Sequence, residues 1–241
     1  TDLLMDGLFT TVTNVSFDDA AIRETISRVQ TLSGGCCYDM KKVWEADEDI
    51  RSLKALILYG LKGIAAYAYH AMMLGHTDDF VNGFFLTGLA AVGNDTYGMD
   101  ELLPLGLKTG ESNLRCMELL DKANTEAYGT PVPAIVPLTI EKGPFIVISG
   151  HDLHDLKLLL EQTKDRGINI YTHGEMLPAH GYPRLKEYPH LKGNFGTAWQ
   201  SQQKEFIDIP APVLFTTNCL MPVKDSYRDR VFTTAVVAYP D

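Results

Sequence analysis

Apolar residues recur every three or four positions through the first half of the chain, from about residue 16 to residue 127. This spacing places them on one face of a helix. The longest such segment runs from about residue 49 to residue 74, and Gly75 follows it as a stop. Its apolar stripe consists of Leu53, Ile57, Leu61, Ile64, Ala68 and Met72.

Three other segments share this period. In the first of them, Ser16 and Asp19 have the spacing of a capping box, which begins a helix. Successive amphipathic helices predict an antiparallel helical bundle, which we place at residues 1–130. The apolar positions of the three segments are Ile22, Ile26 and Val29, then Phe80, Phe84, Phe85 and Leu89, then Leu114, Met117 and Leu120.

The hydrophobic period changes in the second half of the chain. Short apolar runs alternate there with helical segments, which is the β-α-β signature of a parallel sheet. We therefore predict a Rossmann-like parallel-sheet domain at residues 145–241, with a further strand at 231–238. The runs are residues 145–149, 168–172 and 213–217, and the helical segments are residues 153–163 and about 197–207.

A connection separates the two halves. Pro131, Pro133 and Pro137 fit neither a helix interior nor a central strand, so residues 131–144 are predicted to link two domains. The fold class is then α + α/β, an N-terminal helical bundle followed by a parallel-sheet domain.

Each of the three apolar runs is followed by a side chain that can bind metal. His151, Glu175 and Cys219 come shortly after the first, second and third run. In parallel sheets these positions share the carboxyl edge, where ligands bind. An imidazole, a carboxylate and a thiolate together suggest a redox metal site, with loop amides expected to stabilise the thiolate.

Each of the three has an ordinary alternative. An isolated His151 is most often a surface or capping residue, Glu175 a solvated turn residue and Cys219 a small buried hydrophobe. The segment around Glu175, residues 171–183, contains glycines and prolines that predict a fixed irregular loop. His173 and His180 in that segment are predicted to support ligands rather than to bind metal themselves.

Composition narrows the class of protein. The chain has 241 residues, of which 45% are hydrophobic and 22% charged, as expected for a globular protein. A formal net charge of −10 disfavours nucleic acid and anionic membranes as partners. No apolar run reaches the roughly 20 residues of a membrane-spanning helix. Four cysteines with no secretory leader predict reduced thiols and a cytoplasmic location.

The remaining cysteines do not complete a cluster site. Cys36 and Cys37 are adjacent and lack the C-x-x-C spacing, and Cys116 lies on a helical stripe as a packed thiol. Iron–sulfur centres generally use several thiolates, so one cysteine is an incomplete set. No phosphate-binding glycine motif occurs.

Several segments together resemble the hybrid-cluster (prismane) proteins, also called hydroxylamine reductases. In that family a His, a Glu and several cysteines bind an iron–sulfur–oxygen hybrid cluster. The resemblance assigns these roles to His151, Glu175 and Cys219, at intervals of 24 and 44 residues, and makes Glu175 the catalytic residue that releases an iron position for substrate. The segments are residues 13–17, 58–63, 148–156, 171–183, 193–200 and 216–219.

The chain also departs from the family pattern. The N-terminal cysteine motif that binds a second, 4Fe-4S cluster is absent, and the later cysteines and a further Glu of the hybrid cluster would follow Asp241. The stretch between residues 30 and 49 is shorter than in many members. We therefore expect an interior portion, or a reduced relative, with a partial ligand set and no activity in isolation.

The resemblance implies a reductase of hydroxylamine or nitric oxide that receives electrons from a donor reductase. Three alternatives stay open: a cofactor-free, inactive scaffold of the same family, a carbon monoxide dehydrogenase-type relative, and a mononuclear zinc or iron hydrolase with a His/Glu/Cys triad. The oligomeric state is not determined by the sequence.

Overall fold

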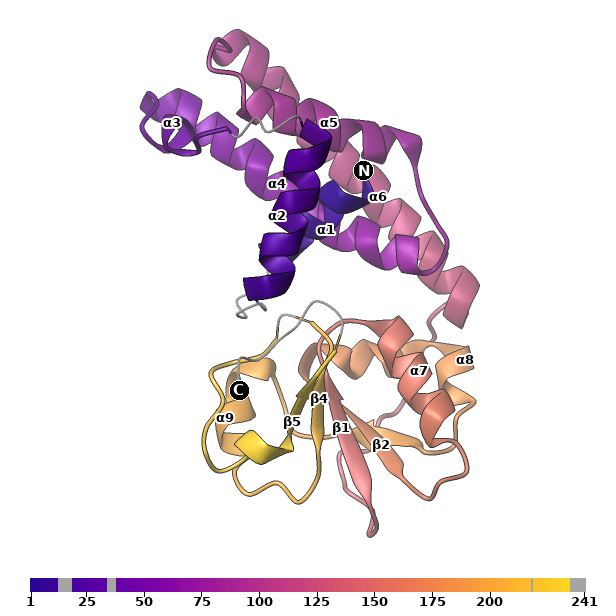
Figure 1. The fold of residues 1–241 in the computed structure, drawn as a ribbon. Coiled ribbons are helices and arrows are strands. Elements are labelled where there is room, and N and C mark those ends of the chain that lie inside the picture. Colours follow the sequence, from indigo (N-terminus) through magenta and orange to yellow (C-terminus); the bar gives the residue numbers. More distant parts are fainter. Residues whose placement is uncertain (13–18, 34–37, 218, 235–241) are drawn as a thin grey trace. The chain divides into compact units, whose positions relative to one another are not determined.

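A computed structural model describes residues 1–12, 19–33, 38–217 and 219–234 of the chain. The chain divides into two compact units, one built on Thr1–Val12 and Asp18–Ala123 and the other from Asn124 onward (Figure 1). The first is helical and the second contains a parallel sheet, so the predicted fold class is confirmed. Among the helices of the described residues, none has the length and apolar character needed to cross a bilayer.

The first unit consists of helices around a central long one. The capping box predicted at Ser16 lies outside the described residues. Helices are present at all four segments where the sequence predicted them. The side chain of Asp47 caps the long helix by accepting from the Asp49 amide, and Asp78 caps the next. The helices are α1 (Asp2–Thr10), α2 (Asp19–Ser33), α3 (Lys41–Trp44), α4 (Glu48–Met73), α5 (Asp79–Val92) and α6 (Met99–Tyr128).

The apolar stripe predicted for α4 is its buried face, since Ile57, Leu61 and Ile64 are fully buried. On α6 the predicted stripe was wrong, because Leu114 and Met117 are 61% and 47% exposed. The face of α6 that packs inward is lined instead by smaller residues. They include Thr109, Ser112, Cys116 and Ala123.

Small residues let the long helices approach closely. A Cβ on Gly60 of α4 would overlap the methyl group of Thr109 on α6. The Cys116 thiol of α6 lies 3.5 Å from the Ile64 carbonyl oxygen of α4, which confirms it as a packed cysteine. Tight packing of this kind leaves little room for added atoms.

The second unit is built on a five-stranded, all-parallel sheet with the order β3-β2-β1-β4-β5. This order places a topological switch point between β1 and β4. Strand β3 was not predicted, and β5 ends at Thr233, with residues 235–241 outside the described part. The strands are β1 (Phe145–Ser149), β2 (Asn169–His173), β3 (Leu191–Asn194), β4 (Val213–Phe215) and β5 (Val231–Thr233).

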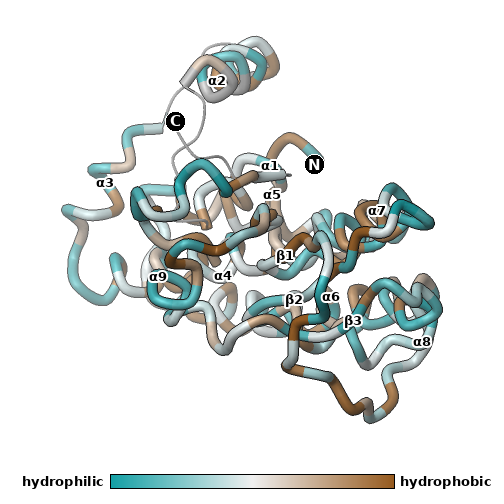
Figure 2. The backbone as a smooth tube through the Cα atoms, turned by 90° about the horizontal axis from the view of Figure 1, so that it is seen from below, coloured by the Kyte–Doolittle hydropathy of each residue, from teal (hydrophilic) through white to brown (hydrophobic). Residues whose placement is uncertain are grey.

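Helices cover the sheet on two sides. In Figure 1 it fans out between α9 (Gln202–Glu205) and the pair α7 (Leu153–Thr163) and α8 (Pro183–Lys186). Helix α7 matches the prediction, whereas the helix predicted at 197–207 is only a 3-10 turn, η2 (Trp199–Ser201), followed by the short α9. Figure 2 shows hydrophobic and hydrophilic residues alternating around α7, as expected for a helix with one buried face.

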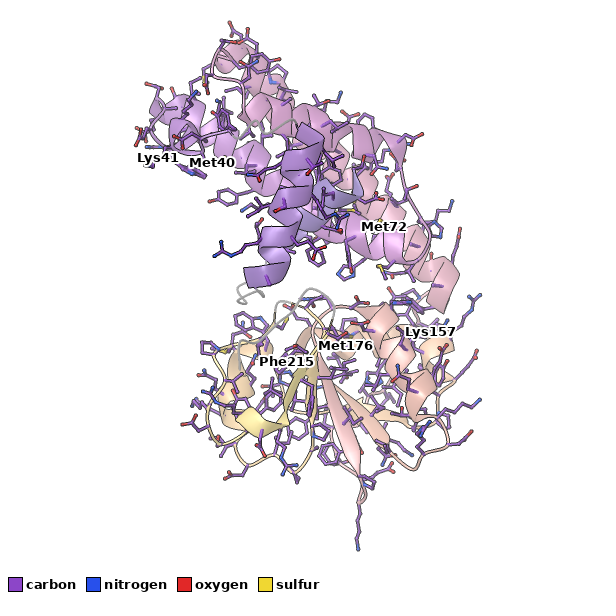
Figure 3. All side chains as sticks on the ribbon, in the orientation of Figure 1. Met40, Lys41, Met72, Lys157, Met176 and Phe215 are labelled. Atoms are coloured by element: carbon purple, nitrogen blue, oxygen red, sulfur yellow. The ribbon has the colours of Figure 1, made fainter. Side chains whose placement is uncertain are left out.

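The core of the second unit lies where α9 meets the sheet. Phe206 follows α9 directly and packs with Val147, Phe215 and Tyr227, all fully buried. Figure 3 shows the side chains of Phe215 and Met176 inside this unit, whereas Lys157 extends outward from α7. This packing fixes α9 against β1 and β4.

Residues 129–144 contain almost no regular structure, and they run beside the edge strand. The Asn194 amide of β3 donates to the Pro137 carbonyl at 2.9 Å, and the Val132 amide donates to the Gly181 carbonyl at 2.8 Å. The segment thus covers part of the β3 edge, which is one way in which proteins protect an edge strand.

The contact between α4 and α6 gives a stability prediction. Replacing Gly60 with Ala should destabilise the first unit by about 1–3 kcal/mol, because the new methyl group overlaps the stiff, buried Thr109 side chain. Gly63, on the same helix, serves as the control, since a Cβ there would meet no atom of a neighbouring element within 4 Å. Gly63→Ala should stabilise by about 0.5–1 kcal/mol through helix propensity. Urea unfolding of both variants tests this, and equal effects would contradict it.

Candidate metal centre

A tight turn after β1 presents His151. Gly150 has a φ of +115°, which favours glycine, and a Cβ there would overlap the Thr216 hydroxyl and lie 2.8 Å from the Thr217 amide nitrogen. Asp152 then caps α7 by accepting from the amides of His154 and Asp155 at 2.8 and 3.1 Å. His151 is therefore held between the end of a strand and the start of a helix.

Two threonines after β4 fasten this turn. The Thr217 hydroxyl accepts from the His151 amide at 2.7 Å and lies 3.0 Å from Nδ1 of the same histidine. The Thr216 hydroxyl accepts from the Asp152 amide at 3.2 Å, and the Thr216 amide donates to the Ser149 carbonyl at 3.0 Å. With Nδ1 beside Thr217, Nε2 is the imidazole nitrogen that contacts Glu175, while the Cys219 sulfur lies at similar distances from both ring nitrogens.

Glu175 lies on a short 3-10 helix after β2. Gly174 has a φ of +59° and begins this helix, η1 (Gly174–Gly181). The irregular loop predicted here was therefore wrong, because successive i,i+3 turns accommodate Pro178 within the helix. The buried Met176 anchors η1, while the Glu175 side chain is 50% exposed.

Cys219 lies in the loop after β4 and is only 5% exposed. Its amide donates to the Thr217 carbonyl at 2.8 Å, and its carbonyl accepts from the Gln202 side chain at 2.6 Å. The preceding residue, Asn218, lies outside the described part. The Cys219 amide thus closes a local turn, and its carbonyl is tied to α9.

The structure brings the three predicted donors together. One donor atom from each of His151, Glu175 and Cys219 lies within 4.8 Å of the other two. Nε2 of His151 contacts Oε2 of Glu175 directly, and the Cys219 sulfur lies 3.5 Å from that oxygen and 3.8 Å from Nε2. Their geometry is that of three side chains able to share a metal, and their role as ligands stays a prediction.

Burial opposes ionisation of the thiol. It raises the pKa of Cys219 to about 12, with a further contribution from the Glu175 carboxylate. Without a metal ion, the surrounding protein groups therefore do not stabilise the thiolate. The expectation from the sequence that loop amides would do so is wrong. A cation between sulfur and carboxylate would invert this balance, because metal coordination deprotonates a thiol.

His173 and His180 are not among the three converging donors. His173 is fully buried, with Nδ1 3.0 Å from the Ser149 hydroxyl and Nε2 3.1 Å from Glu205. Burial lowers the pKa of His173, although Glu205 partly offsets the effect. Nε2 of His180 lies 2.9 Å from the Thr172 hydroxyl. Both histidines therefore hydrogen-bond to neighbouring side chains, and their role in supporting ligands stays a prediction.

Sequence reasoning missed the residues that fasten the loops, namely Gln202, Glu205, Thr216 and Thr217. Their partners lie far away in sequence, and the two on α9 had no motif to mark them. The adjacent threonines before Asn218 and Cys219 were visible, but nothing in the sequence showed that their hydroxyl groups reach the turn after β1.

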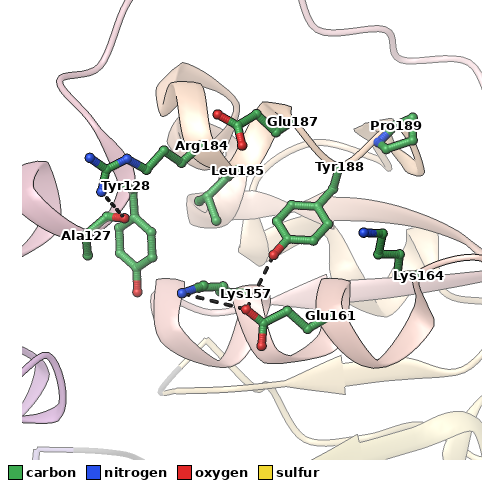
Figure 4. A pocket seen from close by; sticks show the side chains of 10 residues that line it. All are labelled: Ala127, Tyr128, Lys157, Glu161, Lys164, Arg184, Leu185, Glu187, Tyr188 and Pro189. Carbon is green, nitrogen blue, oxygen red and sulfur yellow. Dashed lines mark hydrogen bonds and ion pairs between the residues drawn. The ribbon is translucent and has the colours of Figure 1, made fainter.

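A separate cavity of about 450 Å³ lies elsewhere in the second unit, beside α7 and α8 (Figure 4). Its lining contains none of the three donors, and its charged groups largely pair with one another or with backbone. Lys157 lies 3.7 Å from Glu161, and Arg184 donates to the carbonyls of Glu126 and Ala127. This cavity therefore has no evident part in the candidate centre.

Comparison with known proteins gives the family. The model of the Prismane/CO dehydrogenase family matches residues 1–241, and the chain belongs to this family. It is similar to the hydroxylamine reductase of Methanocella arvoryzae, with 45% identity over 99% of this chain and 50% of the relative. The corresponding protein of Solidesulfovibrio magneticus is 47% identical over 97% of this chain and 49% of the relative.

The hydroxylamine reductase of Thermodesulfovibrio yellowstonii gives a similar match, with 46% identity over 98% of this chain and 49% of the relative. The chain thus spans about half the length of the curated relatives it matches. The resemblance inferred from the motifs is confirmed at the level of the family.

Asp155 gives a pH-dependent prediction. Burial, and next the charge of Asp152, raise the pKa of Asp155 from 3.8 to about 6. The folded state then binds a proton more tightly than the unfolded state, so the contribution of Asp155 to stability falls as pH rises from about 4 to about 6. Asp155→Asn should therefore stabilise the protein relative to wild type more at pH 7.5 than at pH 4.5.

Chemical unfolding at the two pH values measures this difference. Glu187→Gln, which changes an exposed carboxyl in the same unit, is the control and should show no such trend. A stability difference between wild type and Asp155→Asn that is the same at both pH values would contradict the prediction.

Proposed function

We propose that this chain supplies part of the ligand set of an iron–sulfur–oxygen hybrid cluster in a reductase of hydroxylamine or nitric oxide. The observation that carries the proposal is the meeting of His151, Glu175 and Cys219 at the carboxyl ends of three parallel strands. Membership of the Prismane/CO dehydrogenase family and the names of the relatives support it.

The donor set fits part of such a cluster. Thiolate and imidazole suit iron, and the nearly buried sulfur beside a carboxylate is a place where positive charge is favoured. One cysteine is not enough for an iron–sulfur centre, so further thiolates must come from outside these three loops. The second, 4Fe-4S cluster of the parent family has no cysteine motif in this chain.

The residues present have distinct roles in this proposal. Cys219 and His151 hold metal, and Thr217 orients the imidazole by accepting from its Nδ1–H. Glu175 is the catalytic residue, because its half-exposed carboxylate can withdraw and leave a position for a small substrate. When bound, the cluster would supply electrons and Lewis-acid iron to that substrate.

The partners follow from this chemistry. Reduction of a small nitrogen oxide species consumes electrons, so a separate donor reductase must deliver them. A carbon monoxide dehydrogenase-type activity shares the family, but the relatives above are named hydroxylamine reductases. The two other candidates are a cofactor-free scaffold and a mononuclear metal hydrolase.

Iron and acid-labile sulfide analysis tests the proposal. The chain would replace the matching half of the Solidesulfovibrio magneticus relative, and the chimera would be reconstituted anaerobically with iron and sulfide. We expect stoichiometric iron with sulfide in the chimera and no stable cluster in the 241-residue chain alone. Cys219→Ser in the chimera should lower both contents at least about tenfold while leaving the folded state intact.

The outcomes separate the alternatives. Metal without sulfide would favour the mononuclear site, and neither metal nor sulfide would favour the scaffold. Cys116→Ser is the matched control, since that thiol is packed between helices of the first unit. A Cys219→Ser chimera that retains full iron and sulfide would contradict the proposed ligand role.

A further inference from the structure

We propose that Gln202 and Glu205 are positioning residues, which hold the loops of Cys219, Glu175 and His151 so that their donor atoms meet. The inference rests on the proposed ligand role of those three residues. Neither Gln202 nor Glu205 is proposed to bind metal itself. Both belong to α9, the short helix fixed against the sheet by the adjacent Phe206.

Gln202 fastens the loop of Cys219 through both ends of its amide. Its Nε2 donates to the Cys219 carbonyl at 2.6 Å and to the Trp199 carbonyl at 2.8 Å. Its Oε1 accepts from the Met221 amide at 3.0 Å. The side chain is fully buried, so water cannot replace these bonds without rearrangement. One side chain thus fixes the backbone on both sides of Leu220.

Glu205 acts on the other two loops through a chain of hydrogen bonds. Its Oε2 lies 3.1 Å from Nε2 of His173, and Nδ1 of His173 lies 3.0 Å from the Ser149 hydroxyl. Its Oε1 accepts from Thr197 at 2.5 Å. His173 is two residues before Glu175, and Ser149 is two residues before His151. This series of hydrogen bonds therefore reaches the strand ends from which both loops begin.

Chemistry fixes the direction of these hydrogen bonds. A carboxylate only accepts, so Nε2 of His173 carries the proton that it donates to Glu205. Nδ1 is then the acceptor, and the Ser149 hydroxyl donates to it. The fully buried imidazole is held as one tautomer in one orientation, which keeps the end of β2 beside the end of β1.

Gln202 and Glu205 are three residues apart on α9, a spacing that brings side chains to the same side of a helix. One short helix therefore reaches the ends of β1, β2 and β4. Because metal affinity depends on the geometry of all donors together, loosening any one loop should weaken binding. The packing of Phe206 alone does not supply this connection.

Cobalt binding to the full 241-residue chain tests the inference, with Co²⁺ as the probe and thiolate-to-cobalt absorption as the signal. We expect Gln202→Ala and Glu205→Ala each to raise the Kd for Co²⁺ at least about tenfold. Glu205→Gln should stay within about threefold of wild type, because its amide can still accept from His173 and donate to Thr197.

Lys204→Ala is the control, since Lys204 lies on the same helix with an exposed side chain. It should bind Co²⁺ with the wild-type Kd. Folded Gln202→Ala and Glu205→Ala variants that also bind with the wild-type Kd would overturn the inference. Absence of cobalt binding in wild type would count against a metal site formed by these three side chains alone, whereas the chimera tests the ligand role in the proposed function.

A second measurement, on the metal-free chain, tests the inference whether or not the chain binds cobalt. Gln202→Ala should speed alkylation of Cys219 by iodoacetamide at least about fivefold, and Lys204→Ala should not, as measured on the Cys219 peptide by mass spectrometry. Glu205→Ala, but not Glu205→Gln, should speed amide hydrogen exchange in residues 149–151 and 173–175 by a similar factor. Unchanged rates in both alanine variants would show that neither residue positions the loops.

Discussion

The in-register pairing of β1 with β2 and β4 is the constraint on which the candidate centre depends. Ser149 pairs with His173 on one side and with Phe215 on the other. The three strands therefore end at the same level, and the loops after them emerge at one edge of the sheet. Because the strand order changes direction between β1 and β4, this edge is also the switch point where α/β sheets bind ligands.

Buried hydrogen bonds refine that placement. Backbone pairing brings the loops to one edge, but it does not fix where a side chain points. Thr216 and Thr217 tie the loop after β4 to the turn after β1, while Gln202 ties the same loop, and Glu205 the end of β2, to α9. Each bond satisfies a polar group that would cost about 1–3 kcal/mol if it were buried alone. The same bonds that stabilise the fold therefore define the site.

Without a bound metal ion, the electrostatic environment at this edge of the sheet is unfavourable for ionisation of the Cys219 thiol. The Cys219 thiol has its pKa raised to about 12 by burial and by the neighbouring carboxylate. Such local conflicts are typical of functional sites, because the surrounding structure maintains an arrangement that the side chains would not choose. A bound cation between the sulfur and the carboxylate would turn this unfavourable interaction into attraction.

The sequence by itself determined the hydrophobic period of each half, the three central strands and which three side chains meet at the sheet edge. Those features follow from local patterns: Val147 and Ile148 lie in an apolar run, and Gly150, His151 and Asp152 form a strand-to-helix turn. The motifs also indicated the family. Strand β3 was not predicted from the sequence, because Leu191 to Asn194 contains one strongly apolar residue and pairs only at an edge.

Tertiary structure decided the rest. It determined that α6 packs Thr109 and Ser112 inward and leaves Leu114 exposed, because close approach to α4 favours small residues on the inner face. It also determined that Gln202 and Glu205 reach Cys219 and His173, across 17 and 32 residues of chain. Hydrogen bonds between such distant residues leave no periodic trace in a single sequence, since their geometry exists only after the sheet has formed.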